Sequence, residues 1–204
     1  MKKIVDVARR FNLLNTNANY AVVLGASEAT LLEIVNAYAI LANSGNKVKP
    51  QFIDNIWDSK GNSIFHISNL QQNQERATNT AAAYQVISML EGSAKRGTSK
   101  RLKKLGLNIA AKTGTSNNSK DAWFVGVTPE IAVGVYVGFD KPSPLGGRYA
   151  TGSRIALPIF YDFIKSIELT NKPFPIPETI KFTRMDKDSP VKWEAMQQSD
   201  ICYH

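Results

Sequence analysis

The 204-residue sequence predicts an α/β (α+β) domain in which an antiparallel sheet is flanked by helices. Residues 30–41 and 80–95 repeat apolar side chains at the three- and four-residue spacing of amphipathic helices. Between residues 107 and 139 the pattern changes to three consecutive apolar segments separated by turn residues, which is typical of an antiparallel meander.

Capping signals set the expected limits of the helices. A short amphipathic helix is expected at residues 4–11. Thr30 and Glu33 have the spacing of a capping box, so the next helix should begin at Thr30, and Gly45 should end it as its C′ residue. The helix over 80–95 is expected to stop at Gly97.

The strands are expected in two groups. Residues 52–57 and 62–65 flank a polar turn and predict a hairpin. The meander strands are expected at residues 107–115, 122–128 and 131–139.

A final helix is expected at residues 154–169, after a loop rich in glycine and proline. Three prolines alternate from position 173 to position 177 and force an extended exit. The chain is therefore predicted to divide into a domain over 1–170 and a Pro-rich exit and tail over 171–204.

The composition argues against several classes of function. No stretch has the length of a membrane span, and Asp6 interrupts the basic start before a secretory signal develops. One cysteine and two histidines provide neither a disulfide framework nor a metal site, so neither a metal nor another cofactor is expected. The net charge of +8 favours an anionic neighbour such as a lipid surface or cell-wall polymer. No basic run is interleaved with aromatic residues, so nucleic-acid binding is not expected.

Candidate chemistry is concentrated in Lys112, Thr113, Gly114 and Thr115, on the first meander strand. Alternation along a strand places the two threonines on one face and the other two residues on the opposite face. Two hydroxyls and an ammonium can hold a carboxylate, and a glycine lets a ligand approach the backbone closely. The order of residues and the strand context exclude a phosphate-binding loop, whereas a Lys-Thr-Gly triplet alone also arises by chance.

The surrounding motifs give the triplet its significance. The same region continues as Asp121-Ala-Trp-Phe-Val-Gly126, Thr128-Pro129 and Val137-Gly-Phe-Asp140. Further motifs stand elsewhere in the chain: Leu24-Gly-Ala-Ser-Glu-Ala-Thr30, Tyr38-Ala39, Leu41-Ala-Asn43, Arg96-Gly-Thr98, Gly146-Gly147, Thr151-Gly152 and Pro158-Ile-Phe160. In this order and at these spacings, over about residues 1–180, the chain resembles the class A penicillin-binding proteins.

The resemblance implies a partial penicillin-binding transpeptidase/β-lactamase-like fold, with 1–170 as the C-terminal part of the transpeptidase domain. In this family a serine attacks the penultimate D-alanine carbonyl of a peptidoglycan stem peptide, and the acyl group then passes to a neighbouring amine. Lys112 and Thr115 would take catalytic roles, Thr115 through an oxyanion-hole N–H, and Thr113, Gly114 and Thr115 would bind the substrate carboxylate. The expected ligands are stem peptides and β-lactams.

The family's Ser-x-x-Lys and Ser-x-Asn elements are not expected in this chain. Ser44 and Ser189 each begin a Ser-x-x-Lys match, but neither is predicted to start a helix, where the family motif lies. The Ser-x-Asn matches at Ser44 and Ser116 are interpreted as accidental. The isolated chain is therefore expected to be inactive. It is also expected to be poorly stable, because the missing part would leave apolar helix faces exposed.

Three interpretations remain open. The first is a fragment of a bifunctional synthase, whose upstream region would supply the nucleophile, a glycosyltransferase domain and a membrane anchor at the periplasmic face of the inner membrane. The second is a non-catalytic remnant or binding module. The third is a related serine hydrolase, which the motifs over residues 121–124 and 146–160 disfavour.

Overall fold

The computed structural model describes residues 2–15, 20–25, 27–66, 75–146, 149–182 and 201–202. In chain order the elements are α1 (Lys2–Arg10), η1 (Tyr20–Leu24), α2 (Leu31–Ala42), β1 (Asn55–Trp57), β2 (Ser63–His66), α3 (Thr80–Arg96), η3 (Lys100–Leu105), β3 (Ala110–Thr115), η4 (Asn117–Ser119), β4 (Asp121–Val127), β5 (Ala132–Gly138), α4 (Ala156–Ser166), β6 (Lys181–Phe182) and β7 (Ile201–Cys202). The predicted mixed fold class is confirmed, whereas most of the predicted tail lies outside the described residues.

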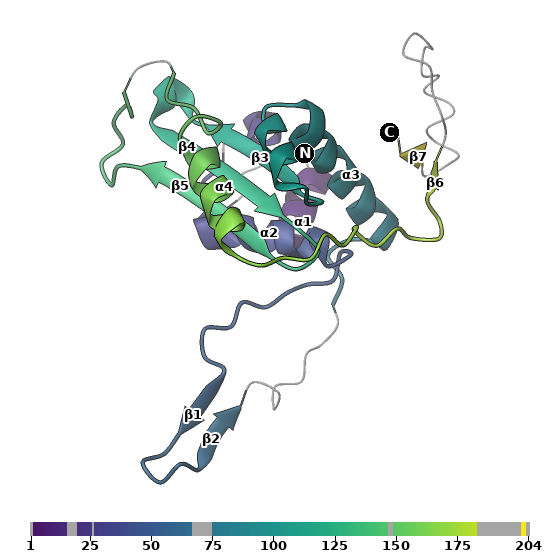
Figure 1. Ribbon diagram of the computed structural model, residues 1–204, viewed down its shortest axis with the longest axis vertical. Helices are drawn as coiled ribbons and strands as arrows, with labels where there is room; N and C mark the ends of the chain where they lie inside the picture. The colour runs from purple at the N-terminus through teal and green to yellow at the C-terminus, as the bar shows by residue number, and fades with distance from the viewer. Residues whose placement is uncertain are drawn as a thin grey trace.

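Strands β3, β4 and β5 form the predicted antiparallel meander in that order, so β3 lies at one edge of the sheet (Figure 1). Lys112 is paired with Val125, and Gly114 is paired with Trp123. Directly paired residues share a face of the sheet, so this register determines which side chains point the same way.

Helix α4 covers one face of the sheet (Figure 1). Phe160 packs against Phe124 with 4.8 Å between ring centroids, and both rings are fully buried. A Cβ on Gly126 would lie 2.5 Å from Cζ of Phe160, so only glycine leaves room for this ring. Thr113 and Thr115 follow the buried Ala111 at the two-residue spacing of a strand, so they share the α4 face to which Ala111 belongs.

Helix α2 covers the opposite face. A Cβ on Gly134 would lie 2.4 Å from Cγ2 of Val35, so this helix packs directly on the backbone of β5. Lys112 belongs to the same face, because Val125 pairs with both Lys112 and Gly134. Helix α3 packs beside β3, where Ile87 and Ala110 belong to one buried cluster.

The ends of α2 show why the helix stops where it does. The predicted capping box is present, with the backbone N–H of Thr30 donating to Oε2 of Glu33 at 2.7 Å. At the other end Ser44, with φ of 55°, takes the C′ position that was predicted for Gly45. Gly45 follows at C″ and donates its N–H to the carbonyl of Ile40 at 2.8 Å, which completes a Schellman motif.

Replacing Thr30 with alanine is expected to lower the free energy of unfolding by about 1 kcal/mol, because the hydroxyl caps the N–H of Glu33. The backbone N–H of Thr30, followed by its hydroxyl, lowers the pKa of Glu33 below its ordinary value of 4.5. The stabilisation from this carboxylate is therefore complete above that value and is lost as pH falls through the folded pKa.

Urea unfolding at neutral pH, together with an NMR titration of Glu33, checks this prediction. Thr179→Ala, at an exposed position after α4, serves as the control. An unchanged urea midpoint in Thr30→Ala would contradict the capping role.

The predicted hairpin is present as β1 and β2, which extend away from the body of the domain (Figure 1). Strand β1 is shorter than predicted, β2 has the predicted length one residue later, and a register shift after Ile56 interrupts the ladder. The carboxylate of Asp58 accepts the N–H groups of Lys60 and Asn62, each at 2.8 Å, and so closes the turn.

Candidate functional site

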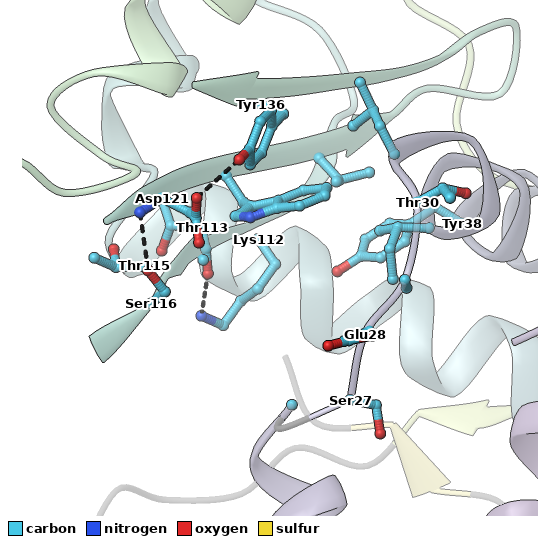
Figure 2. A pocket seen from close by; sticks show the side chains of 17 residues that line it. Ser27, Glu28, Thr30, Tyr38, Lys112, Thr113, Thr115, Ser116, Asp121 and Tyr136 are labelled. Atoms are coloured by element: carbon cyan, nitrogen blue, oxygen red, sulfur yellow. Dashed lines mark hydrogen bonds between the residues drawn. The ribbon is translucent and has the colours of Figure 1, made fainter. Parts of the chain in front are cut away.

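A hollow of about 780 Å³ lies between the start of α2 and the β3 side of the sheet (Figure 2). Its lining comprises Gly25, Ser27, Glu28, Ala29, Thr30, Leu31, Ile34, Tyr38, Lys112, Thr113, Gly114, Thr115, Ser116, Asp121, Trp123, Val125 and Tyr136. All four candidate residues on β3 therefore border the same space.

The backbone N–H and C=O groups of successive β3 residues point alternately toward β4 and away from it, and this alternation determines which of them are available to a ligand. Ser116 donates its N–H to the carbonyl of Asp121 at 3.1 Å, so Ser116 faces β4. Successive residues of an antiparallel strand alternate between facing the neighbour and facing away. Thr113 and Thr115 therefore direct their backbone groups to the outer edge of β3, which pairs with no other strand among the described residues.

Lys112 reaches this edge from the α2 face. Its exposed side chain places Nζ 3.0 Å from the carbonyl oxygen of Thr113, to which it donates (Figure 2). The two threonine hydroxyls belong to the opposite face, as predicted. The ammonium and the hydroxyls thus approach each other only along the edge of the strand.

The hydroxyls of Thr113 and Thr115 each have a hydrogen-bonding partner in a segment outside the sheet. Oγ1 of Thr113 lies 3.1 Å from Oγ1 of Thr98, in the segment after α3. Oγ1 of Thr115 accepts the N–H of Gly152, before α4, at 3.1 Å. Sequence reasoning did not assign these contacts, although both partners stand in motifs of the family resemblance.

Two glycines allow close backbone approach at the site. A Cβ on Gly114 would lie 3.1 Å from Cβ of Trp123. A Cβ on Gly152 would lie 2.3 Å from the carbonyl oxygen of Trp123 and 2.5 Å from that of Gly114. The loop before α4 is therefore held directly against β3 and β4.

An aromatic pair lines the α2 side of the hollow. The rings of Trp123 and Tyr136 have centroids 4.7 Å apart, and the hydroxyl of Tyr136 donates to Oδ1 of Asp121 at 2.8 Å (Figure 2). This hydrogen bond, more than burial and the nearby carboxylate charges, raises the pKa of Tyr136. Phe124 is fully buried in the core, whereas Trp123 is only partly buried and borders the hollow.

A second, mostly apolar hollow of about 700 Å³ continues from the first between α1, α2 and α3. The two share Gly25, Ser27, Glu28, Ala29, Ile34 and Tyr38. Ile4 and Val7 of α1 line the second hollow and remain 37% and 41% exposed. The apolar side of α1 is thus partly open.

Neither Ser27 nor Ser116, the serines that line the hollow, starts an α-helix. Ser44 follows α2 instead of starting it, and Ser189 lies outside the described residues. Oγ of Ser116 accepts the N–H of Asp121 at 2.8 Å. Oγ of Ser27 is buried and has no hydrogen-bond partner among the described residues.

In the part of the chain that the structure describes, no three His, Cys, Asp or Glu side chains gather closely enough to hold a metal ion. No described helix combines the length and apolarity needed to cross a membrane.

Comparison with known proteins identifies the family. Residues 8–165 match the family model for the penicillin binding protein transpeptidase domain. Penicillin-binding protein 1A of Rickettsia conorii is 44% identical over 91% of this chain, and the match covers 26% of that relative. The chain thus spans about a quarter of the length of such curated relatives.

Solved structures agree with this assignment. PonA1 of Mycobacterium tuberculosis, a penicillin-binding protein, is 26% identical, with a TM-score of 0.73 over 85% of this chain and 51% of that chain. Penicillin-binding protein 1A of Haemophilus influenzae, at 24% identity, has the same fold with a TM-score of 0.73 over 84% of this chain and 32% of that chain. The chain therefore belongs to the penicillin-binding transpeptidase family, in its class A branch.

Proposed function

We propose that this chain supplies the substrate-binding strand of a D,D-transpeptidase that cross-links peptidoglycan stem peptides through an acyl-serine. The observation that carries the proposal is the alignment of Lys112, Thr113 and Thr115 along the outer edge of β3, within a family-matched domain. β-Lactams would occupy the same edge as the stem peptide.

The polar groups at this edge suit the C-terminal carboxylate of a stem peptide. The ammonium of Lys112 supplies positive charge, and hydroxyls at Thr113 and Thr115 supply hydrogen bonds. Gly114 leaves the α2 face of β3 without a side chain next to Lys112, and an extended peptide can lie against the outer edge as an added strand.

The backbone N–H of Thr115 is proposed to form half of an oxyanion hole. The strand phase supports this role, because Thr115 faces the unpaired edge. When a serine attacks the penultimate D-alanine carbonyl, negative charge develops on its oxygen, and a donor held there stabilises it by about 3 kcal/mol. The C–N bond then breaks, the terminal D-alanine leaves, and an amine of a second stem accepts the acyl group.

The attacking serine is proposed to come from a segment outside these 204 residues. The open hollows against α2 support this proposal, because their apolar lining provides a surface on which a further helix can pack. In the whole protein this segment would be accompanied by a glycosyltransferase domain and a membrane anchor, at the periplasmic face of the inner membrane. Without the serine, the same edge is a carboxylate-binding module that does not turn over.

Replacing Lys112 with methionine tests the proposal. We expect the 204-residue chain to bind acetyl-D-Ala-D-Ala more tightly than its C-terminal amide, as measured by NMR titration. The substitution should weaken acid binding by about tenfold, since a hydrogen bond to a charged group contributes about 1.5–3 kcal/mol.

Lys60→Met removes the same charge from the turn of the hairpin and serves as the control, because Lys60 does not line the hollow. Equal affinity of the wild-type chain for acid and amide would refute carboxylate recognition.

A further inference from the structure

The hydroxyl of Thr98 and the backbone N–H of Gly152 contact the two threonine hydroxyls of β3. We propose that Thr98 and Gly152 are positioning residues that donate to Thr113 and Thr115 and so leave both hydroxyl hydrogens for a ligand at the open edge, which thereby selects an anionic acceptor. The inference rests on the proposed function and adds to it the residues that set specificity.

Gly152 fixes the direction at Thr115 without ambiguity. A backbone N–H can only donate, so the hydrogen bond of 3.1 Å uses Oγ1 of Thr115 as the acceptor. The hydroxyl hydrogen of Thr115 is not consumed by this bond and remains available to a ligand. Thr115 thus presents a donor to whatever lies along the strand.

Thr98 completes the same arrangement at Thr113. Either hydroxyl of this pair can donate across the 3.1 Å contact. When a carboxylate lies at the edge, it can only accept, so Thr113 must donate to it and must accept from Thr98. The ammonium of Lys112 is also a donor only. The side chains at the edge then offer three donors, a set that matches a carboxylate and presents no side-chain acceptor to an amide NH2.

Both positioning groups are held by the ends of helices. Thr98 directly follows Gly97, the C-cap of α3, whose N–H donates to the carbonyl of Ser93 at 3.0 Å. The carbonyl of Gly152 accepts the N–H of Ala156, the first residue of α4, at 3.1 Å. Gly152 also lies so close to the carbonyl oxygens of Gly114 and Trp123 that a Cβ would displace it. Groups attached to packed elements in this way keep their direction when a ligand binds.

Thr98→Val tests the inference because it removes the hydroxyl and keeps the shape. Thr98 is exposed, so folding should be retained. The probes are acetyl-D-Ala-D-Ala and its C-terminal amide. In Thr98→Val the ratio of acid affinity to amide affinity should fall about tenfold from its wild-type value, and Thr98→Ser should restore it. Thr179→Val, outside the hollow, should leave the preference unchanged.

Two readouts need no ligand. In Thr98→Val, three-bond couplings should show the Thr113 side chain averaging between rotamers, whereas one rotamer should dominate in the wild type. In Thr115→Val, the amide hydrogen of Gly152 should exchange faster, and Thr115→Ser should keep it protected.

The outcomes separate this inference from the proposed function. A wild-type chain that prefers the acid, together with a Thr98→Val chain that prefers it equally, would overturn the positioning role alone. A wild-type chain without any preference would overturn the proposed function and this inference with it. An unchanged Thr113 rotamer in Thr98→Val, or unchanged Gly152 exchange in Thr115→Val, would contradict the hydrogen-bond directions themselves.

Discussion

Replacing Phe160 with alanine is expected to lower the free energy of unfolding by about 4 kcal/mol. The ring is fully buried against Phe124, and the bare backbone of Gly126 lies under it. Neither neighbour can fill the space, because one is a rigid ring and the other has no side chain. The variant therefore loses both the buried apolar surface and its packing contacts.

Urea unfolding of the 204-residue chain measures this loss. Phe163→Ala, on the same helix at a position that is 45% exposed, is the matched control and should cost much less. Equal losses for the two variants would show that α4 is not anchored through Phe160. An anchored α4 matters for the site, because the loop before this helix carries Gly152.

A fluorescent penicillin is expected to leave no covalent label on the 204-residue chain. Acylation needs an activated nucleophile, and the serines around the hollow are poorly arranged for it. Ser116 is engaged with the N–H of Asp121, and Oγ of Ser27 is buried. Ser44, which does not line the hollow, follows the C-terminus of α2 and has a φ of 55°.

The labelling experiment needs a positive control and a check that the chain is folded. An intact class A penicillin-binding protein should be labelled under the same conditions, and binding of acetyl-D-Ala-D-Ala should show that the edge of β3 is formed. A serine adduct located by mass spectrometry would disprove the expectation and identify a nucleophile within the chain. Alanine at that serine should then abolish the label.

Local patterns predicted the scaffold well. The capping box at Thr30 depends on residues three positions apart, and the meander depends on alternation within strands and short turns. Such signals lie within a few residues of the structure that they specify. The C′ position of α2 was wrong by one residue, because Ser44 adopts the left-handed conformation usually left to glycine, and Gly45 is used for its close approach to Thr78.

The site was only partly predictable, because the contacts that orient it join residues that are far apart in the sequence. The motif on β3 is contiguous, so alternation assigned its residues to faces correctly. The hydrogen bonds that orient it join Thr98 to Thr113 and Thr115 to Gly152, pairs separated by 15 and 37 positions. No periodicity connects such pairs, and only packing of α3 and of the loop before α4 against the sheet brings them together. Trp123 illustrates the same limit, because alternation does not indicate which face has a hollow.

The tilted contact between Trp123 and Tyr136 at the wall of the hollow gives it an intrinsic optical signal. An indole at the wall of a binding site changes its emission when a ligand displaces solvent from it. Trp57 emits from the hairpin, where 61% of its surface is exposed, and contributes a background independent of the site. A chain with phenylalanine at Trp57 and Trp193 would therefore report occupancy of the hollow through a single tryptophan, without any attached dye.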